Sequence, residues 1–452
     1  MTINNKFLCM IMILVSVSFS RINPDQGSIV EVELLDSMSA EEIYNYLNPI
    51  LDIFTPLNGY DVDIYSITYE TIDSQGNITL ASGALAVPDI DNGYLPLLSY
   101  QHGTQLERLG VASINGFDIV SMWLGTSGYV TALPDYLGLG ISELFHPYMI
   151  YEDNAISIID MLRASKEFCS LNNINLNNQL FLIGYSEGGY TTMATHKMIE
   201  ENFENEFSIT ASAPAAGPYD LSTVMANLML SNEPYGQPYY LPYTVLAYQD
   251  KYNIVNEIEE YFTEYYAEIL PPMFDGYHSA SDVNNVMPSI PIDIFRPEVI
   301  EDFSNNMNHP LRLKLVDNDL HDWAPVAPMK IFHSEGDELV PIENSENAYM
   351  NFILNGAPNV DFEFGPWGTH QDAAALILIG AATWFNELKH FDMVGDLNQD
   401  NIIDILDIML LVNIILEIEQ LDHSLHWLAD VNSDDNLNIY DIIQIMNNML
   451  FN

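Results

Sequence analysis

The fold is decided by the ten residues Gln179-Leu180-Phe181-Leu182-Ile183-Gly184-Tyr185-Ser186-Glu187-Gly188. The first half is mostly apolar and predicts a buried β-strand, and residues 189–200 carry the apolar spacing of a helix. A strand, a Gly-x-Ser-x-Gly turn and a helix in this order predict a nucleophile elbow, in which a strained turn holds the serine hydroxyl clear of the backbone. The flanking glycines let the strand and the helix approach closely. Ser186 is therefore the candidate nucleophile, and the alternative is a capping serine in an ordinary turn.

The candidate acid is Asp337. It follows an apolar strand pattern that starts at Met329, and it comes directly after the turn glycine Gly336. This position puts a carboxylate at the carboxyl end of a strand, where the acid of such a site belongs. Glu338 is the nearest alternative and Glu335 is less well placed. A turn or helix-capping aspartate without chemistry is the other interpretation.

The candidate base is His370, in a Gly/Pro loop between a strand over 360–364 and a long apolar helix over 373–388. A histidine in this loop can reach the elbow. It would take the proton of Ser186 and pass it to the leaving group, while Asp337 holds its tautomer. His321 precedes the acid and His333 lies on the strand itself, so both are weaker alternatives.

An oxyanion hole needs two backbone N–H groups. The residue after the nucleophile, Glu187, supplies the first. The second comes from the loop Gln101-His102-Gly103-Thr104, which follows a strand over 95–100, so the candidates are Gly103 and Thr104.

Residues from about 94 to 391 resemble the α/β-hydrolase fold, and within it the secretory lipase branch of the lipase A type. The resemblance rests on the elbow, on the Gln-His-Gly-Thr loop, and on the segments Ala132-Leu133-Pro134-Asp135-Tyr136-Leu137-Gly138-Leu139-Gly140, His146-Pro147-Tyr148, Gly336-Asp337 with Val340-Pro341, and Gly368-Thr369-His370. Membership implies hydrolysis of carboxylic esters through an acyl-enzyme without a cofactor. Related secreted peptidases share much of this pattern, so amide hydrolysis stays open.

The chain is strongly acidic. It has 452 residues and a formal charge of −52, from 12 Lys and Arg against 64 Asp and Glu. Such a surface repels nucleic acid and anionic membranes. Charged residues make up only 17% of the chain and hydrophobic residues 48%, which indicates a folded protein with an acidic surface rather than a disordered one.

The amino terminus has the pattern of a secretory signal peptide over residues 1–20. Lys6 precedes an apolar run from Phe7 to Val17, and Ser18-Phe19-Ser20 offers small residues for cleavage. The run is too short for a membrane-spanning helix. Removal of this peptide takes Cys9 away and leaves Cys169 alone, so no internal disulfide is expected in a secreted protein.

A long insertion separates the elbow from the acid, from about residue 219 to 325. It is too long for a plain connection and predicts a helical cap over the site, with helix-like stretches over 221–230 and 254–270. The insertion is rich in aromatic residues, such as Tyr239, Tyr240, Tyr243 and Phe274. These side chains could line an acyl pocket, or they could pack the cap onto the core.

Two Asp/Asn-rich loops repeat at a spacing of 34 residues near the carboxyl end. Each places oxygen side chains at loop positions 1, 3, 5, 9 and 12, with a backbone carbonyl at position 7, which is the spacing of a calcium loop. The predicted ligands are Asp396, Asn398, Asp400, Ile402, Asp404 and Asp407 in the first loop, and Asp430, Asn432, Asp434, Asn436, Asn438 and Asp441 in the second. Metal-free Asp/Asn turns are the alternative.

The double loop resembles a dockerin over residues 394–452, which implies two calcium ions and a cohesin-like protein partner. Positions 10 and 11 are Ile405-Leu406 and Ile439-Tyr440, where many cellulosomal dockerins have a small polar pair. Calcium binding does not depend on these positions, whereas the choice of partner does.

Together these patterns predict an α/β protein: a signal peptide (1–20), an α/β-hydrolase domain with a helical cap (21–393) and a small all-α calcium-binding module (394–452). Near the amino end, strands over 64–71 and 78–87 should pair around a turn at 73–77. The function predicted is a secreted or cell-surface serine esterase or lipase acting on lipid or other acyl esters. A secreted serine peptidase and a catalytically idle surface-assembly protein are the alternatives.

Overall fold

The structure is a computed structural model of the chain. It describes residues 26–51, 59–90, 93–390, 392–398, 402–416, 418, 421, 426–432, 434 and 436–451. The predicted signal peptide and the predicted ligand Asp400 lie outside the described residues.

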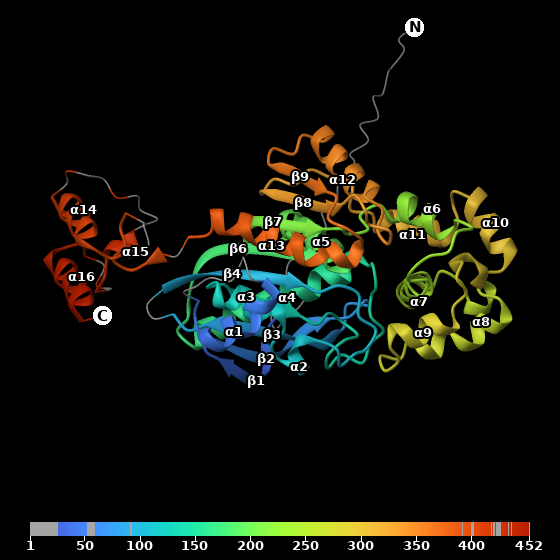
Figure 1. Ribbon diagram of the computed structural model, residues 1–452, viewed down its shortest axis with the longest axis horizontal. Helices are drawn as coiled ribbons and strands as arrows, with labels where there is room; N and C mark the ends of the chain where they lie inside the picture. The colour runs from blue at the N-terminus through green and yellow to red at the C-terminus, as the bar shows by residue number, and fades with distance from the viewer. Residues whose placement is uncertain are drawn as a thin grey trace, which may run out of the picture.

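Strands and helices alternate along most of the described chain (Figure 1). The strands are β1 (Ile29–Met38), β2 (Val62–Ile72), β3 (Ile78–Pro88), β4 (Gly93–Gln101), β5 (Val130–Pro134), β6 (Asn175–Tyr185), β7 (Ile209–Ala215), β8 (Met329–Ser334), β9 (Val360–Gly365) and β10 (Asp392–Met393). The helices outside the insertion are α1 (Ala40–Leu51), α2 (Ala112–Asn115), α3 (Ile119–Thr126), α4 (Tyr151–Leu171), α5 (Glu187–Asn202), α12 (Glu343–Leu354), α13 (His370–Leu388), α14 (Ile405–Ile415), α15 (His426–Ala429) and α16 (Ile439–Phe451).

One mixed sheet forms the centre, in the order β1-β2-β3-β5-β4-β6-β7-β8-β9. The pairs from β5 to β9 are parallel, and β1, β2, β3 and β5 pair antiparallel. Apolar clusters cover both faces: α4, α5 and α12 contribute to one, and α1, α3 and α13 to the other. Burial on both faces explains the mostly apolar run over the second half of β6, from Leu180 to Tyr185. The predicted α/β class is confirmed.

The predicted hairpin is confirmed, because β2 and β3 pair from Val62↔Pro88 to Ile72↔Ile78. The strand β1 was not predicted. It lies at the sheet edge with most of its residues exposed. The alternation of apolar and acidic residues in Val30-Glu31-Val32-Glu33-Leu34 was the signal in the sequence that could have found it. No helix among the described residues is long and apolar enough to cross a membrane.

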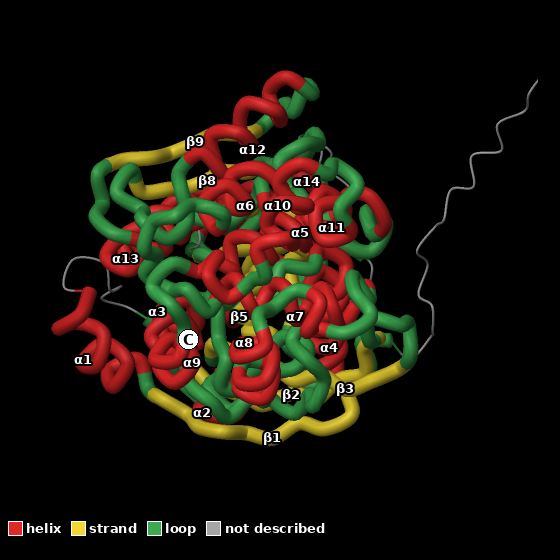
Figure 2. Tube along the Cα trace, turned by 90° about the vertical axis from the view of Figure 1, so that its right-hand side faces the viewer, coloured by secondary structure: helices red, strands yellow, loops and turns green. Residues whose placement is uncertain are grey.

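The insertion folds into short helices that lie at one end of the sheet, while the C-terminal helices lie at the other (Figure 1). Figure 2 looks onto the insertion, with α7, α8 and α9 in front of the sheet. Its elements are η1 (Leu221–Met225), α6 (Ala226–Met229), α7 (Tyr240–Tyr252), η2 (Ile258–Glu260), α8 (Glu264–Ile269), η3 (Pro271–Met273), α9 (Ala280–Val286), η4 (Pro291–Ile294), α10 (Pro297–Asn305) and α11 (Pro310–Asp317).

The predicted helix over 221–230 is present as η1 and α6, but a continuous helix over 254–270 is wrong. Asn253 is left-handed, with φ 49°, and ends α7 just before that stretch. The helix α7 was not predicted from the sequence. It contains Pro242, and proline disfavours the interior of a helix. Pro242 falls in the first turn of α7, where its missing N–H is tolerated.

Four buried residues hold the C-terminal module together: Leu397, Leu411, Ala429 and Ile445. They come from both repeats, so α14 and α16 pack on one another and form a core separate from that of the sheet.

The close approach of strand and helix at the elbow is a testable constraint. A Cβ added to Gly188 would lie 2.0 Å from the backbone oxygen of Gln101, which cannot move without disrupting β4. We therefore expect Gly188→Ala to lower the free energy of unfolding by about 3 kcal/mol, measured by denaturant titration. Gly380→Ala in α13 is the control, because its Cβ would make an ordinary 3.7 Å contact with Phe332. A Gly188→Ala protein as stable as the control would contradict this reading of the elbow.

Candidate active site

Ser186 occupies the strained turn between β6 and α5. Its φ is 63° and its ψ −123°, a conformation that non-glycine residues rarely adopt. The Ser186 N–H donates to Ala215 O at 2.9 Å, which ties the turn to the end of β7. The side chain is 8% exposed, so its hydroxyl lies in a largely enclosed space.

The structure brings the three predicted residues together. His370 Nε2 lies 2.9 Å from Ser186 Oγ, and His370 Nδ1 lies 2.6 Å from Asp337 Oδ2. Asp337 follows β8, while His370 is the first residue of α13 rather than part of the loop before it. The helix start is set by Thr369, whose side chain accepts from Asp372 N, and the Tyr185 hydroxyl donates to His370 O at 2.6 Å. The catalytic roles of the three remain predictions.

The alternative acid Glu338 does not meet the imidazole. Its carboxylate accepts from the backbone N–H of His370 at 3.0 Å, so it positions the start of α13. The alternative histidine His333 makes an unpredicted contact with the acid: its Nε2 lies 2.8 Å from Val340 O and 3.3 Å from Asp337 Oδ2. The spacing of four residues across the predicted turn at Gly336 was the available signal, but sequence alone could not show that the two side chains face one another.

The charge of Asp337 is well stabilised. Its other oxygen accepts from the backbone N–H groups of Leu339 and Val340 at 3.0 and 2.8 Å. Burial raises the pKa of Asp337, but hydrogen bonds from His333 and His370 outweigh that effect and hold the pKa at about 2. The carboxylate is therefore ionised at any pH above that value.

The predicted oxyanion loop lies against the elbow. A Cβ on Gly103 would lie 3.5 Å from Tyr185 O and 3.9 Å from Ser186 Cβ. The neighbouring Thr104 hydroxyl is 3.0 Å from the Tyr148 hydroxyl. Glu187 opens α5 directly after the serine, so its backbone N–H belongs to the unpaired first turn of a helix. The loop and the start of α5 therefore both lie beside Ser186, and a function of their N–H groups as an oxyanion hole stays a prediction.

An apolar cavity of about 90 Å³ reaches Ser186 from the insertion. Its lining is almost entirely hydrophobic and comes mainly from η1, α6, α7, α10 and α11, with Met225, Met229, Leu241, Val245, Ile300, Phe303, Leu311 and Leu315 among the lining residues. The insertion thus covers the serine, as a cap would.

Of the four aromatic residues singled out in the sequence, only Tyr240 lines this cavity. The other three are buried and pack the cap onto the core, with Tyr243 stacked on Tyr148 at 4.4 Å and on Phe274 at 5.2 Å. The packing interpretation therefore holds for Tyr239, Tyr243 and Phe274.

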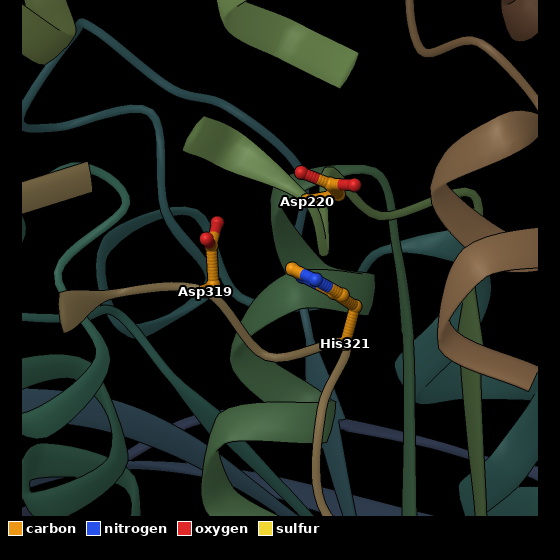
Figure 3. Close-up of side chains that lie close together, drawn as sticks. All are labelled: Asp220, Asp319 and His321. Carbon is orange, nitrogen blue, oxygen red and sulfur yellow. The ribbon is translucent and has the colours of Figure 1, made fainter. Parts of the chain in front are cut away.

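One group of possible metal ligands lies at the base of the cap, where Asp220, Asp319 and His321 come within 4.8 Å of one another (Figure 3). These residues come from the two ends of the insertion. Asp220 accepts from Thr223 N at 3.0 Å, and Asp319 accepts from the N–H and hydroxyl of Ser222 at 3.0 and 2.5 Å. The bonds between Asp319 and Ser222 join the two ends of the insertion, whereas the bond from Thr223 to Asp220 caps the start of η1. The alternative base His321 also lies here, with its Nδ1 3.4 Å from Tyr219 O.

In the C-terminal module, the loop-ending carboxylates face inward. Asp407 accepts from Leu397 N at 2.9 Å, and Asp441 accepts from Asn438 N at 2.9 Å. Four predicted ligands are buried: Asp396, Asp407, Asp430 and Asp441. The segment from Asp396 onward has no Lys or Arg, and buried carboxylates without a cation are costly. The oxygen-rich donor set therefore fits a calcium ion in each loop.

Comparisons with known proteins agree with this architecture. The secretory lipase family model matches residues 101–228, and the dockerin type I domain model matches residues 394–450. The rice cell wall degrading esterase LipA from Xanthomonas oryzae superposes with a TM-score of 0.74 at 29% identity, over 81% of this chain and 100% of that chain. A ligand-bound form of LipA aligns at 30% identity with a TM-score of 0.73, over 80% of this chain and 98% of that chain.

Candida antarctica lipase A shares the fold, with a TM-score of 0.61 at 16% identity over 80% of this chain and 82% of that chain. A search of curated proteins gave no match. The identity and coverage to LipA show that the chain belongs to the secretory lipase family of α/β-hydrolases and carries a C-terminal dockerin type I module.

Proposed function

We propose that this member of the secretory lipase family hydrolyses carboxylic esters through an acyl-enzyme formed on Ser186. The hydrogen-bonded series from Ser186 Oγ through the His370 ring to Asp337 carries the proposal, with contacts of 2.9 and 2.6 Å. A serine hydroxyl is a weak nucleophile unless a base takes its proton, and His370 is placed to do so.

The steps follow from this geometry. Ser186 Oγ attacks the ester carbonyl carbon while His370 Nε2 takes the hydroxyl proton, and that proton then passes to the leaving alcohol. Water attacks the acyl-enzyme with His370 again as base, which releases the carboxylic acid and restores the serine. Asp337 accepts from Nδ1–H and stays ionised throughout, because its pKa is held at about 2. The N–H groups of Glu187 and of Gly103 or Thr104 would receive the oxyanion.

The cavity favours an acyl group as the part of the substrate that is recognised. Its walls are mostly hydrocarbon, so each methylene group of an acyl chain that is buried there favours binding by about 0.8 kcal/mol. No acidic residue is among those described as lining it, so the ammonium group of a peptide would find no partner there. This observation favours esters of apolar acids, including lipids, over peptide amides.

The setting proposed is outside the cell, in agreement with the secretory family and the signal-peptide pattern. The dockerin module would bind two calcium ions and attach the enzyme to a cohesin-like partner. Its residues at loop positions 10 and 11 are exposed: Ile405 57%, Leu406 52%, Ile439 63% and Tyr440 65%. The partner would therefore present an apolar surface.

The converging serine, histidine and aspartate argue against a purely structural protein.

The catalytic assignment predicts a graded set of losses. Ser186→Ala should lower kcat for p-nitrophenyl esters by on the order of 10⁶, and His370→Ala by a similar factor, since the two act as a unit. Asp337→Asn should lower kcat by a factor on the order of 10⁴, because the imidazole would adopt the wrong tautomer. A prolyl or dipeptidyl amide assayed in parallel should be turned over far more slowly. Ester hydrolysis surviving in Ser186→Ala above a few per cent would refute the assignment.

The cavity assignment predicts a change in chain-length preference. Leu241→Trp should fill part of the cavity that reaches Ser186, so that kcat/KM for p-nitrophenyl esters of long acids falls at least about tenfold while the acetate is little affected. Leu313→Trp is the matched control, since Leu313 lies on α11 of the cap but is 44% exposed and outside the lining. Equal chain-length profiles for the two variants would show that acyl chains bind elsewhere.

The calcium assignment predicts two separable ions in the full chain. Calorimetry should show that Asp396→Ala with Asp407→Ala removes one ion, and Asp430→Ala with Asp441→Ala the other. Asp361→Ala on β9 is the control, because this side chain is 69% exposed and far from both loops in the chain. Chelation should unfold the module while ester hydrolysis continues, because each part has its own core. Absence of calcium uptake by the full chain would rule the sites out.

A further inference from the structure

The residue after the nucleophile carries a buried carboxylate that the proposed chemistry does not use. Glu187 is 1% exposed, and its Oε1 lies 2.6 Å from Nε2 of His146, which is also buried. The other carboxylate oxygen, Oε2, is buried without a hydrogen-bond partner. A charge in this position lies one residue from Ser186, beside the N–H that would receive the oxyanion.

The hydrogen bonds of His146 decide the charge of the pair. His146 Nδ1 lies 2.8 Å from Leu137 O, and a carbonyl oxygen only accepts, so Nδ1 carries a proton. The 2.6 Å contact between Nε2 and Glu187 needs a second proton, because two bare acceptors repel at that distance. Whichever atom holds this second proton, the pair as a whole is neutral.

The surroundings of His146 suit a cation. Three tyrosine rings lie around the imidazole, with ring centres at 5.8, 6.1 and 5.8 Å for Tyr136, Tyr148 and Tyr243. Aromatic rings attract a positive charge at such separations. Among the described residues, no Lys or Arg forms an ion pair with Glu187, so His146 is the group in contact that can balance its charge.

We propose that His146 is a positioning residue for ester hydrolysis: its proton neutralises Glu187, so that the residue-187 N–H meets the developing oxyanion without a negative charge beside it. The inference rests on the proposed function of Ser186. An unbalanced buried carboxylate would oppose charge development in the transition state, where the environment is dry and electrostatic effects are strong. Substrate binding, which creates no charge, would be little affected.

The test compares His146→Gln with the double variant His146→Gln/Glu187→Gln. The single variant leaves Glu187 unbalanced, and we expect kcat for p-nitrophenyl acetate to fall about 10²–10³-fold, as for a lost oxyanion donor, with KM within about threefold. The double variant removes the carboxylate charge, and its kcat should be at least about tenfold higher than that of His146→Gln. A role in packing alone would predict no recovery.

His196→Gln is the matched control, because the buried His196 lies 3.0 Å from another glutamate, the half-buried Glu200, ten residues along the chain from Ser186. It should lose stability but keep its kcat. If His146→Gln fails to fold, circular dichroism should still show a folded and active double variant. Retention of kcat within about threefold in His146→Gln, or a double variant no better than the single, would overturn the proposal.

Labelling by a fluorophosphonate separates this inference from the proposed function. If Ser186 is the nucleophile, the unmodified enzyme is labelled there once per chain, and His146→Gln should be labelled at the same site but at least about tenfold more slowly. Absence of label at Ser186 in the unmodified enzyme would refute the proposed function. Labelling of His146→Gln at the normal rate would refute only the role of His146.

Discussion

The left-handed turn at Ser186 is the constraint on which the rest of the structure depends. A φ of 63° at a residue with a side chain costs on the order of 1–3 kcal/mol and persists only where neighbouring contacts hold it. Here the bond from Ser186 N to Ala215 O fixes the turn, and Gly188 lets α5 reach the Gln101 backbone. The strain sets the serine above the sheet edge and starts α5 with a free N–H at Glu187. One backbone conformation thus places the Ser186 hydroxyl and the first N–H of α5, that of Glu187, together.

The parallel arrangement of the central strands brings the other groups to this turn. Asp337 follows β8 and His370 follows β9, and both strands run parallel to β6, so their carboxyl ends meet at one edge. The insertion leaves the sheet at the same edge after β7 and returns before β8, which is why it covers Ser186 rather than another part of the molecule. The contacts between Ser222 and Asp319 close its base. The site is therefore a product of topology more than of local sequence.

Buried carboxylates have different partners in the α/β-hydrolase domain and in the C-terminal module. Around Ser186 each buried carboxylate has partners of its own: Asp337 has two histidines and two backbone N–H groups, and Glu187 has His146. In the C-terminal module, the buried carboxylates have backbone N–H partners but no Lys or Arg within the module. The proposed chemistry uses the first arrangement, whereas the second fits the cation that the proposed calcium sites would supply.

Local patterns in the sequence determined the elbow at Ser186, the order of serine, acid and histidine, the two oxygen-rich loops and the alternation of strands and helices. These features depend on residues close together in the chain, where periodicity, glycines and turn chemistry act. Only the tertiary structure decided which histidine meets Ser186, that His333 also touches Asp337, that His146 meets Glu187, and that α7 forms despite Pro242. The three side-chain contacts join segments that are distant in the chain and that the fold brings together. The helix α7 forms although a proline lowers its local helix propensity. In each case long-range packing decides the outcome, and no local sequence pattern records it.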